Sequence, residues 1–217
     1  MARIIHLAIK VEDLEDATKF YEDVFGFRQT GTGYARGHVS RHMTDGQLDV
    51  ALMVCDNEDV HEAQLSGEGP CIHHWGIEVE DRDATVKLIE TNGATIISEP
   101  GQGALKFRAP DGTVAEIVAA GRYKKNEQAN GSRIVHLAIK VMDLENGTRF
   151  YENVFGFRRV APGRNHEHIS RHMTDGAFDL APMVYDSENS HEAQLAGPLC
   201  ADSSLGCRSR RPGAFRG

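Results

Sequence analysis

The segment HVSRHMTDGQLDVALMV (38–54) places a histidine and an aspartate where they could act together. Asp45-Gly46 separates two runs of strand character, and Asp-Gly in that setting is a strong hairpin signal. A two-residue turn sets His42 opposite Asp49 on one face of the hairpin. An imidazole beside a carboxylate can act as a general base, so both are candidate catalytic residues; a hydrogen-bonded structural pair is the alternative. The same turn gives the opposed pairs Thr44–Gln47 and Ser40–Ala51.

The elements around this hairpin are predicted from periodicity and capping residues. In IIHLAIKV (4–11) alternate residues are strongly apolar, as in a strand with one face covered by a helix. Asp13 can cap a helix over 14–25, where apolar residues recur at helical spacing, and Gly26 is a natural stop. The same order of strand, helix and three strands returns in weaker form after residue 71. This pattern predicts that residues 3–120 form two βαβββ halves.

An internal repeat organises the chain. Aligning His6 with His136 sets an offset of 130 residues, which carries FYEDVFGFR (20–28) onto FYENVFGFR (150–158) without a gap. The polar stretch RYKKNEQANGS (122–132) is predicted to be a linker. We call residues 1–121 the first copy, a complete domain, and residues 133–200 the second copy, which matches only the first half of a domain.

The last residues break the repeat. At the offset of 130, DSSLG (202–206) stands where the first copy has IHHWG (72–76). The codons GAT-TCA-TCA-CTG-GGG encode Asp-Ser-Ser-Leu-Gly. The same string read one base later gives ATT-CAT-CAC-TGG, which encodes Ile-His-His-Trp. This arithmetic supports the hypothesis that 201–217 is a frame-shifted tail, and we expect it to be disordered.

Composition excludes several classes of protein. The chain has 217 residues, 40% of them hydrophobic, and no apolar run reaches membrane-spanning length. A formal net charge of −8 disfavours nucleic acid and anionic membranes as partners. The N-terminus does not look like a secretory signal, so we expect a cytoplasmic protein. The four cysteines lack C-x-x-C spacing and are predicted to be plain thiols.

Three motifs together resemble the vicinal oxygen chelate superfamily, which includes glyoxalase I, methylmalonyl-CoA epimerase, extradiol dioxygenases and bleomycin-resistance proteins. They are H-x-x-x-x-V-x-D-L (6–14), F-Y-x-x-x-x-G-F (20–27) and A-P-D-G-x-x-x-E (109–116). The resemblance covers 3–120 and 133–200. It implies an α+β fold in which paired βαβββ modules form an open mixed-sheet barrel around a divalent metal.

The resemblance also implies a ligand set. Metal ligands of the family lie on the first strand of each half and on the last strand of the second half, which here gives His6, His74 and Glu116. His73 is expected on the helix-covered face instead. Two imidazoles and one carboxylate suit Fe, Mn, Ni, Zn or Co, and three ligands leave positions for two oxygens of a substrate.

The chain departs from the family in two places. Glyoxalase I and the epimerase have Glu or Gln on the fourth strand, where this chain has Ala51, so a fourth protein ligand is not expected. Extradiol dioxygenases have a His and a Tyr near the last hairpin, where this chain offers Lys106 and Arg108. These two cations are candidate substrate-binding residues for an anionic group; solvated strand cations are the alternative.

Three functions remain open. The first is a glyoxalase-like lyase or isomerase that needs one divalent metal ion and acts on a small molecule with adjacent oxygens. The second is an Fe(II) extradiol dioxygenase that cleaves catechol rings. The third is a protein that sequesters a ligand, as bleomycin-resistance proteins do. We expect a small-molecule substrate and leave a homodimer open. The second copy is expected to expose an apolar sheet surface and to hold no metal of its own.

Overall fold

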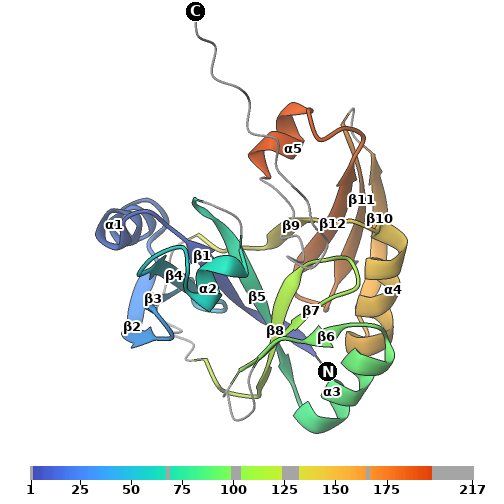
Figure 1. Cartoon of the computed structure of the whole chain (residues 1–217), viewed down its shortest axis with the longest axis horizontal. Helices are drawn as coiled ribbons and strands as arrows, with labels where there is room; N and C mark the ends of the chain where they lie inside the picture. Colours follow the sequence, from blue (N-terminus) through green and yellow to red (C-terminus); the bar gives the residue numbers. More distant parts are fainter. Residues whose placement is uncertain (1, 67–68, 99–103, 124–131, 165–166, 197–217) are drawn as a thin grey trace, which may run out of the picture.

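The computed structural model describes residues 2–66, 69–98, 104–123, 132–164 and 167–196. These residues form two mixed sheets, with strand order β2-β3-β4-β1-β5-β8-β7-β6 in one and β10-β11-β12-β9 in the other (Figure 1). The eight-stranded sheet does not close. The predicted α+β fold of repeated βαβββ modules is therefore confirmed, and the incompleteness of the second copy stays a prediction. The predicted frame-shifted tail, 201–217, and most of the predicted linker lie outside the described residues.

The first copy contains two modules. The first comprises β1 (Arg3–Lys10), α1 (Leu14–Phe25), β2 (Arg28–Ala35), β3 (His38–Thr44) and β4 (Asp49–Cys55), followed by the short helix α2 (His61–Gln64). The second comprises β5 (Cys71–Val79), α3 (Arg82–Thr91), β6 (Thr95–Ile96), β7 (Leu105–Arg108) and β8 (Val114–Ala119). The second copy comprises β9 (His136–Lys140), α4 (Leu144–Phe155), β10 (Arg158–Arg164), β11 (His168–Thr174), β12 (Asp179–Tyr185) and α5 (His191–Leu195). In the described part of the chain, the longest helices have only 12 residues, and none could span a membrane.

Capping residues set the helix bounds where the sequence predicts them. The Asp13 carboxylate accepts the backbone N–H of Asp16 at 2.9 Å and starts α1, and Gly26 ends that helix with φ 71°. Asp81 and Asp143 start α3 and α4 in the same way. A left-handed φ of this kind is the conformation that favours glycine, so the helix ends at this residue.

The predicted two-residue turn between β3 and β4 is wrong. Thr44 pairs with Asp49 and His42 with Ala51, so residues 45–48 form a four-residue loop. The Asp45 carboxylate accepts the N–H groups of Gln47 and Leu48 at 2.8 and 2.7 Å, which stabilises the longer loop. Because this register differs from the predicted one by two residues, every side chain keeps its face. His42 and Asp49 therefore still share one side of the sheet.

The two modules of the first copy meet through their first strands. β1 pairs with β5 in antiparallel fashion at the centre of the sheet, while β4 and β8 flank them as parallel neighbours. A residue near the middle of β1 consequently lies beside a residue near the middle of β5. This arrangement positions the candidate site.

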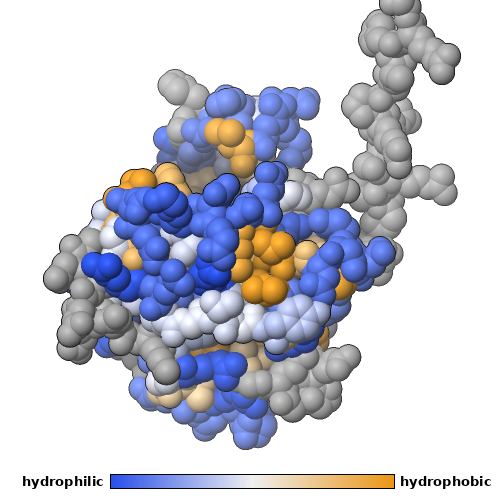
Figure 2. Space-filling view, turned by 90° about the vertical axis from the view of Figure 1, so that its left-hand side faces the viewer, coloured by the Kyte–Doolittle hydropathy of each residue, from blue (hydrophilic) through white to orange (hydrophobic). Residues whose placement is uncertain are grey.

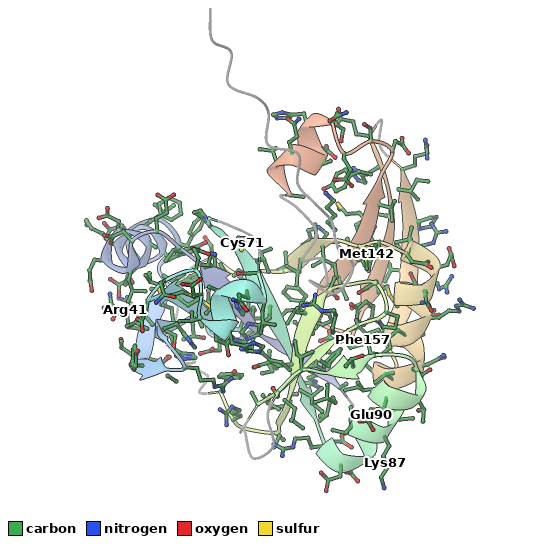
Figure 3. The ribbon with its side chains drawn as sticks, viewed as in Figure 1. Arg41, Cys71, Lys87, Glu90, Met142 and Phe157 are labelled. Atoms are coloured by element: carbon green, nitrogen blue, oxygen red, sulfur yellow. The ribbon has the colours of Figure 1, made fainter. Side chains whose placement is uncertain are left out.

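The second copy packs against the first. In α4, Phe150 lies 5.8 Å from Phe107 between ring centroids, and Tyr151 lies 5.4 Å from Trp75. Phe157, just after α4, is buried in the same core, whereas Lys87 and Glu90 of α3 point away from it (Figure 3). The prediction of an exposed apolar surface concerned the sheet of the second copy and stays a prediction, whereas its helix α4 is buried against the first copy. Its apolar side chains complete a core that spans both copies.

Two reciprocal hydrogen bonds join the copies at equivalent positions. The N–H of Ile4 donates to Asp175 Oδ2 at 2.7 Å, and the N–H of Ile134 donates to Asp45 Oδ2 at 2.9 Å. Both donors and both acceptors are related by the offset of 130. The two first modules are thus related by a local two-fold arrangement.

The equivalent helix of the first copy is not covered. Phe20 and Val24 of α1 are 51% and 57% exposed, whereas Phe150 and Val154 of α4 are 2% and 8% exposed. Figure 2 shows an apolar patch on the face of the molecule that carries α1. The second module of the first copy covers α4, and no equivalent module among the described residues covers α1.

We expect Phe150→Ala to lower the free energy of unfolding by about 3–5 kcal/mol, because it opens a cavity in the shared core. Phe20→Ala, the same substitution at the equivalent exposed position, should lower it by less than about 1 kcal/mol. Urea unfolding of the full chain measures both values. Equal losses for the two variants would show that α4 does not pack on the first copy.

Candidate metal centre

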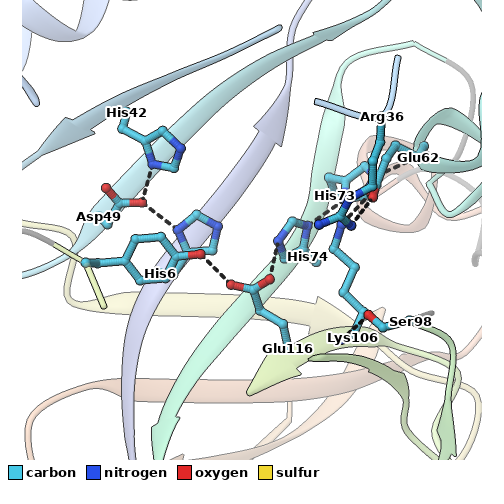
Figure 4. Close-up of polar contacts among 11 residues, drawn as sticks. His6, Arg36, His42, Asp49, Glu62, His73, His74, Ser98, Lys106 and Glu116 are labelled. Atoms are coloured by element: carbon cyan, nitrogen blue, oxygen red, sulfur yellow. Dashed lines mark hydrogen bonds and ion pairs between the residues drawn. The ribbon is translucent and has the colours of Figure 1, made fainter. Parts of the chain in front are cut away.

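Three buried side chains converge on neighbouring strands of the first copy. His6 comes from β1, His74 from β5 and Glu116 from β8, and their nearest ligand atoms all lie within 4.8 Å of one another (Figure 4). His74 Nε2 lies 3.4 Å from Glu116 Oε2, and the two imidazole rings are 5.2 Å apart between centroids. The structure thus brings together the three side chains that were predicted as ligands.

A glycine leaves room for this cluster. Gly76 pairs with His6 on one side and with Glu116 on the other. A Cβ atom at position 76 would lie 2.8 Å from Cβ of His6 and 3.2 Å from Glu116 Oε1. Since carbon atoms do not approach that closely, any larger residue would push the two side chains apart.

Asp49 fixes the orientation of two imidazoles. Its Oδ2 lies 2.7 Å from Nδ1 of His6 and 2.8 Å from Nδ1 of His42. A carboxylate only accepts hydrogen bonds, so His6 donates through Nδ1, which leaves Nε2 as its candidate ligand atom. Burial opposes the charge of Asp49, but the hydrogen bonds from His42 and His6 lower its pKa overall. The bond to Asp49 in turn raises the pKa of His42.

His73 fixes the orientation of His74, and the sequence did not predict this. His73 Nε2 lies 2.6 Å from the carbonyl oxygen of Glu62, so it donates, and its Nδ1 lies 2.6 Å from Nδ1 of His74. Burial lowers the pKa of His73, so its ring is neutral and Nδ1 accepts. His74 therefore donates through Nδ1 and keeps Nε2 free, as His6 does.

The expected position of His73 on the helix-covered face is wrong for its imidazole. Ala8 pairs with His74 but the next residue, Ile9, pairs with Ile72, so the ladder skips His73. Such a bulge re-aims a side chain and breaks the simple alternation of faces. Two adjacent histidines in a strand were the signal, but the bulge cannot be read from them.

The charges of the site favour a cation. Burial opposes the charge of Glu116, yet the neighbouring side chains His74, His6 and Tyr123 lower its pKa well below the usual range. Burial lowers the pKa of His74 to about 4, so this imidazole is neutral near pH 7. Two imidazoles and one carboxylate form a donor set that suits a divalent transition metal.

Tyr123 also belongs to the site, although the sequence analysis assigned it to the linker. Its hydroxyl donates to Glu116 Oε1 at 2.6 Å, and its ring lies parallel to His6 with centroids 4.4 Å apart. No motif marks this residue. Its position depends on the turn that follows β8.

The two predicted substrate-binding cations lie in different places. Lys106 is buried and forms an ion pair with Glu62 of α2, which Arg36 also contacts at 2.9 Å (Figure 4). Arg108 donates to the carbonyl of Gly112 at 3.1 Å in the β7–β8 hairpin. Only Lys106 lies near the candidate metal centre.

The sequence matches a known protein family. Residues 3–117 and 133–199 match the sequence profile of the Glyoxalase/Bleomycin resistance protein/Dioxygenase superfamily. The chain belongs to this superfamily.

Relatives within the superfamily are distant. The "Probable lactoylglutathione lyase, chloroplastic" of Arabidopsis thaliana is 24% identical over 199 residues, which are 86% of this chain and 51% of that protein. The chain thus spans about half the length of this relative. Among solved structures, a mutant of 4-hydroxymandelate synthase from Streptomyces coelicolor has a TM-score of 0.68 at 15% identity, over 85% of this chain and 63% of its own. BphC, a halotolerant catechol dioxygenase, has a TM-score of 0.59 at 16% identity, over 84% of this chain and 64% of the BphC chain. These two structures support the superfamily fold alone.

The second copy repeats the carboxylate–histidine contacts of the first module. Asp179 Oδ2 lies 2.6 Å from His136 Nδ1 and 2.9 Å from His172 Nδ1, which reproduces the contacts of Asp49. The described residues of the second copy contain no second module that could supply counterparts of His74 and Glu116. The absence of an independent metal from this copy stays a prediction.

His6→Ala should abolish stoichiometric metal binding, because it removes one of only three protein ligands. His136→Ala, the equivalent change in the second copy, should leave one metal per chain. Elemental analysis after loading with Co(II) or Zn(II) and desalting measures both. Full metal content in the His6→Ala variant would show that the ligands are misassigned.

The metal-free protein should lose stability as the pH falls from about 6.5 to about 4. In this window unfolded His74 binds a proton and folded His74 does not, so proton uptake favours unfolding, by roughly 2–3 kcal/mol for this residue. His73 acts in the same direction. Urea unfolding in EDTA at several pH values should give a shallower decline for His74→Gln. The same slope in both proteins would contradict the burial argument.

Proposed function

We propose that the chain is a metal-dependent enzyme of the glyoxalase-like type, a lyase or isomerase that acts on a small substrate with adjacent oxygen atoms. One observation carries the proposal: His6, His74 and Glu116 converge, and both imidazoles are anchored at Nδ1. One divalent ion of Fe, Mn, Ni, Zn or Co fits this donor set. When bound, it would act as a Lewis acid that polarises a substrate carbonyl.

In this proposal His42 and Asp49 move the proton. Asp49 is buried and holds His42 by its Nδ1, while the His42 side chain is 31% exposed. Nε2 of His42 is therefore the atom that can take a proton from a substrate carbon or oxygen and return it. The carboxylate stabilises the imidazolium that forms in between.

Lys106 would serve an anionic part of the substrate. With Arg36 and Ser98 it lines a cavity of about 600 Å³, whose remaining wall includes the apolar residues Ile97 and Leu65. Glu62 pairs with both cations there, and the charge of Lys106 lowers the pKa of Glu62 against the effect of burial. An anionic substrate group would have to bind Lys106 and Arg36 beside Glu62 or in place of it. Arg108, which donates to Gly112 in the hairpin, is the weaker candidate.

An Fe(II) extradiol dioxygenase is the second candidate function. It is favoured by Ala51, which pairs with Ala8 and His42 and offers no fourth ligand beside the two imidazoles and one carboxylate. Anaerobic reconstitution with Fe(II), followed by oxygen and catechol, distinguishes the two. Ring cleavage would support the dioxygenase.

We expect the chain loaded with Ni(II), Co(II) or Zn(II) to convert lactoylglutathione, the molecule named in the relative's activity, or a close analogue. Chelation should remove this activity and added metal should restore it. The release of free thiol and of an α-ketoaldehyde in equal amounts measures the reaction, because hydrolysis of the thioester would give the thiol and a hydroxy acid instead. A metal-loaded protein that binds such compounds without turnover would instead indicate a ligand-sequestering function.

His42→Gln should lower kcat by roughly 10²–10⁴-fold, because it removes the proton-transfer group. Metal content should be retained, since His42 is not one of the three predicted ligands. His172→Gln in the second copy is the matched control and should keep the full rate. Unchanged kcat for His42→Gln would return the pair with Asp49 to a structural role.

A further inference from the structure

Tyr123 contacts two of the three predicted metal ligands. Its hydroxyl donates to Glu116 Oε1 at 2.6 Å. Its ring lies over the His6 imidazole at 4.4 Å, with 7° between the planes. Glu116 thus has one oxygen bound to the phenol, and the other, Oε2, faces Nε2 of His74 at 3.4 Å.

A turn after β8 brings Tyr123 back over the sheet. β8 ends at Ala119, and the N–H of Arg122 donates to the Ala119 carbonyl at 3.3 Å. Gly121 has φ 76°, which favours glycine, and its N–H donates to Glu78 Oε2 on β5 at 2.8 Å. The chain therefore reverses at a fixed point, and residue 123 returns to the strands that carry the site.

We propose that Tyr123 is a positioning residue of the metal centre, which holds Glu116 by one oxygen and covers His6. This inference rests on the proposed metal-dependent function. It goes beyond the predicted ligand set, which left Tyr123 in the linker.

The hydrogen bond decides how many oxygens Glu116 can offer. With Oε1 engaged by the phenol, Oε2 is the oxygen left for an ion, so Glu116 would hold a metal through one atom. Three protein donor atoms would then leave positions for the two oxygens of a substrate. Without the phenol, Glu116 would be free to rotate away from His6 and His74, which would weaken the hold on an ion.

The ring has a second effect. It stacks on the His6 imidazole, and its centroid also lies 6.0 Å from that of the His42 ring. The guanidinium carbon of Arg122 lies 5.9 Å from the Tyr123 ring centroid. This packing keeps water from His6 and should slow the release of a bound ion.

The chain offers a matched control. Tyr34 also donates its hydroxyl to a carboxylate, Asp56, at 2.5 Å, but it is exposed and lies on β2 at the edge of the sheet. Tyr34→Phe therefore removes a phenol–carboxylate hydrogen bond of the same kind away from the site. Any general effect of losing a phenol hydroxyl, as measured in Tyr34→Phe, can be subtracted from the effect of Tyr123→Phe.

The test titrates Co(II) into the metal-free full-length chain. Tyr123→Phe should weaken binding by about 10–100-fold, the usual effect of losing a partner that orients a ligand, and should change the visible Co(II) spectrum as Glu116 binds differently. Tyr34→Phe should match the wild type in both. Tyr123→Leu, which also removes the ring, should release Co(II) to EDTA faster than Tyr123→Phe.

Two results would overturn the proposal in distinguishable ways. If the wild type binds Co(II) and Tyr123→Phe has the same Kd and spectrum, the positioning role is wrong and the metal site stands. If the wild type binds no Co(II), the metal-dependent function is wrong, and the role of Tyr123 is wrong with it. The unfolding midpoint of each metal-free variant is the control that shows whether the variant is folded.

Discussion

The site depends on a single row of paired residues across three strands. His6 on β1 faces Gly76 on β5, and Gly76 faces Glu116 on β8. The glycine in the middle of the row provides the space in which the two flanking side chains approach each other. His74 lies two residues from Gly76 on the same strand and so adds its ring to the same face. If β1 and β5 slipped by one residue, this face would lose the cluster, because every side chain of one strand would change sides.

Each imidazole of the cluster is oriented by its own surroundings. Asp49 on β4 holds His6, and His73 on β5 holds His74, so the two Nδ1 atoms are bound before any ion is present. The second copy shows which of these contacts the first module makes without a second module. Its Asp179 makes the same contacts to two histidines without a second module beside it. The first module therefore builds its carboxylate–histidine group alone, and the second module adds His74 and Glu116.

Local patterns predicted local structure well. The aspartates that cap the helices, the glycines that end them and the alternation in β1 depend on neighbours in the sequence, and the helices begin where these signals lie. The predicted register of the β3–β4 hairpin was wrong because the hydrogen bonds that the Asp45 side chain accepts, rather than the Asp-Gly dipeptide, fix the loop length. The face of His42 was nevertheless right, since a shift of two residues preserves alternation. The bulge at His73 and the turn that returns Tyr123 to the site depend on distant strands, and no short motif encodes them.

The contact between the copies shows why helix sequence alone does not predict burial. α1 and α4 share 8 of 12 residues, yet α1 is exposed where α4 is buried. One difference between them is Ala17 against Gly147, and a Cβ atom at 147 would lie 2.7 Å from Cβ of Asp111 in the first copy. The missing side chain lets α4 approach the β7–β8 hairpin, where Tyr151 bonds to Thr113 at 2.7 Å. That hairpin leads into β8, which carries Glu116. The second copy therefore stabilises the strand that completes the site, although it supplies none of the three candidate ligands.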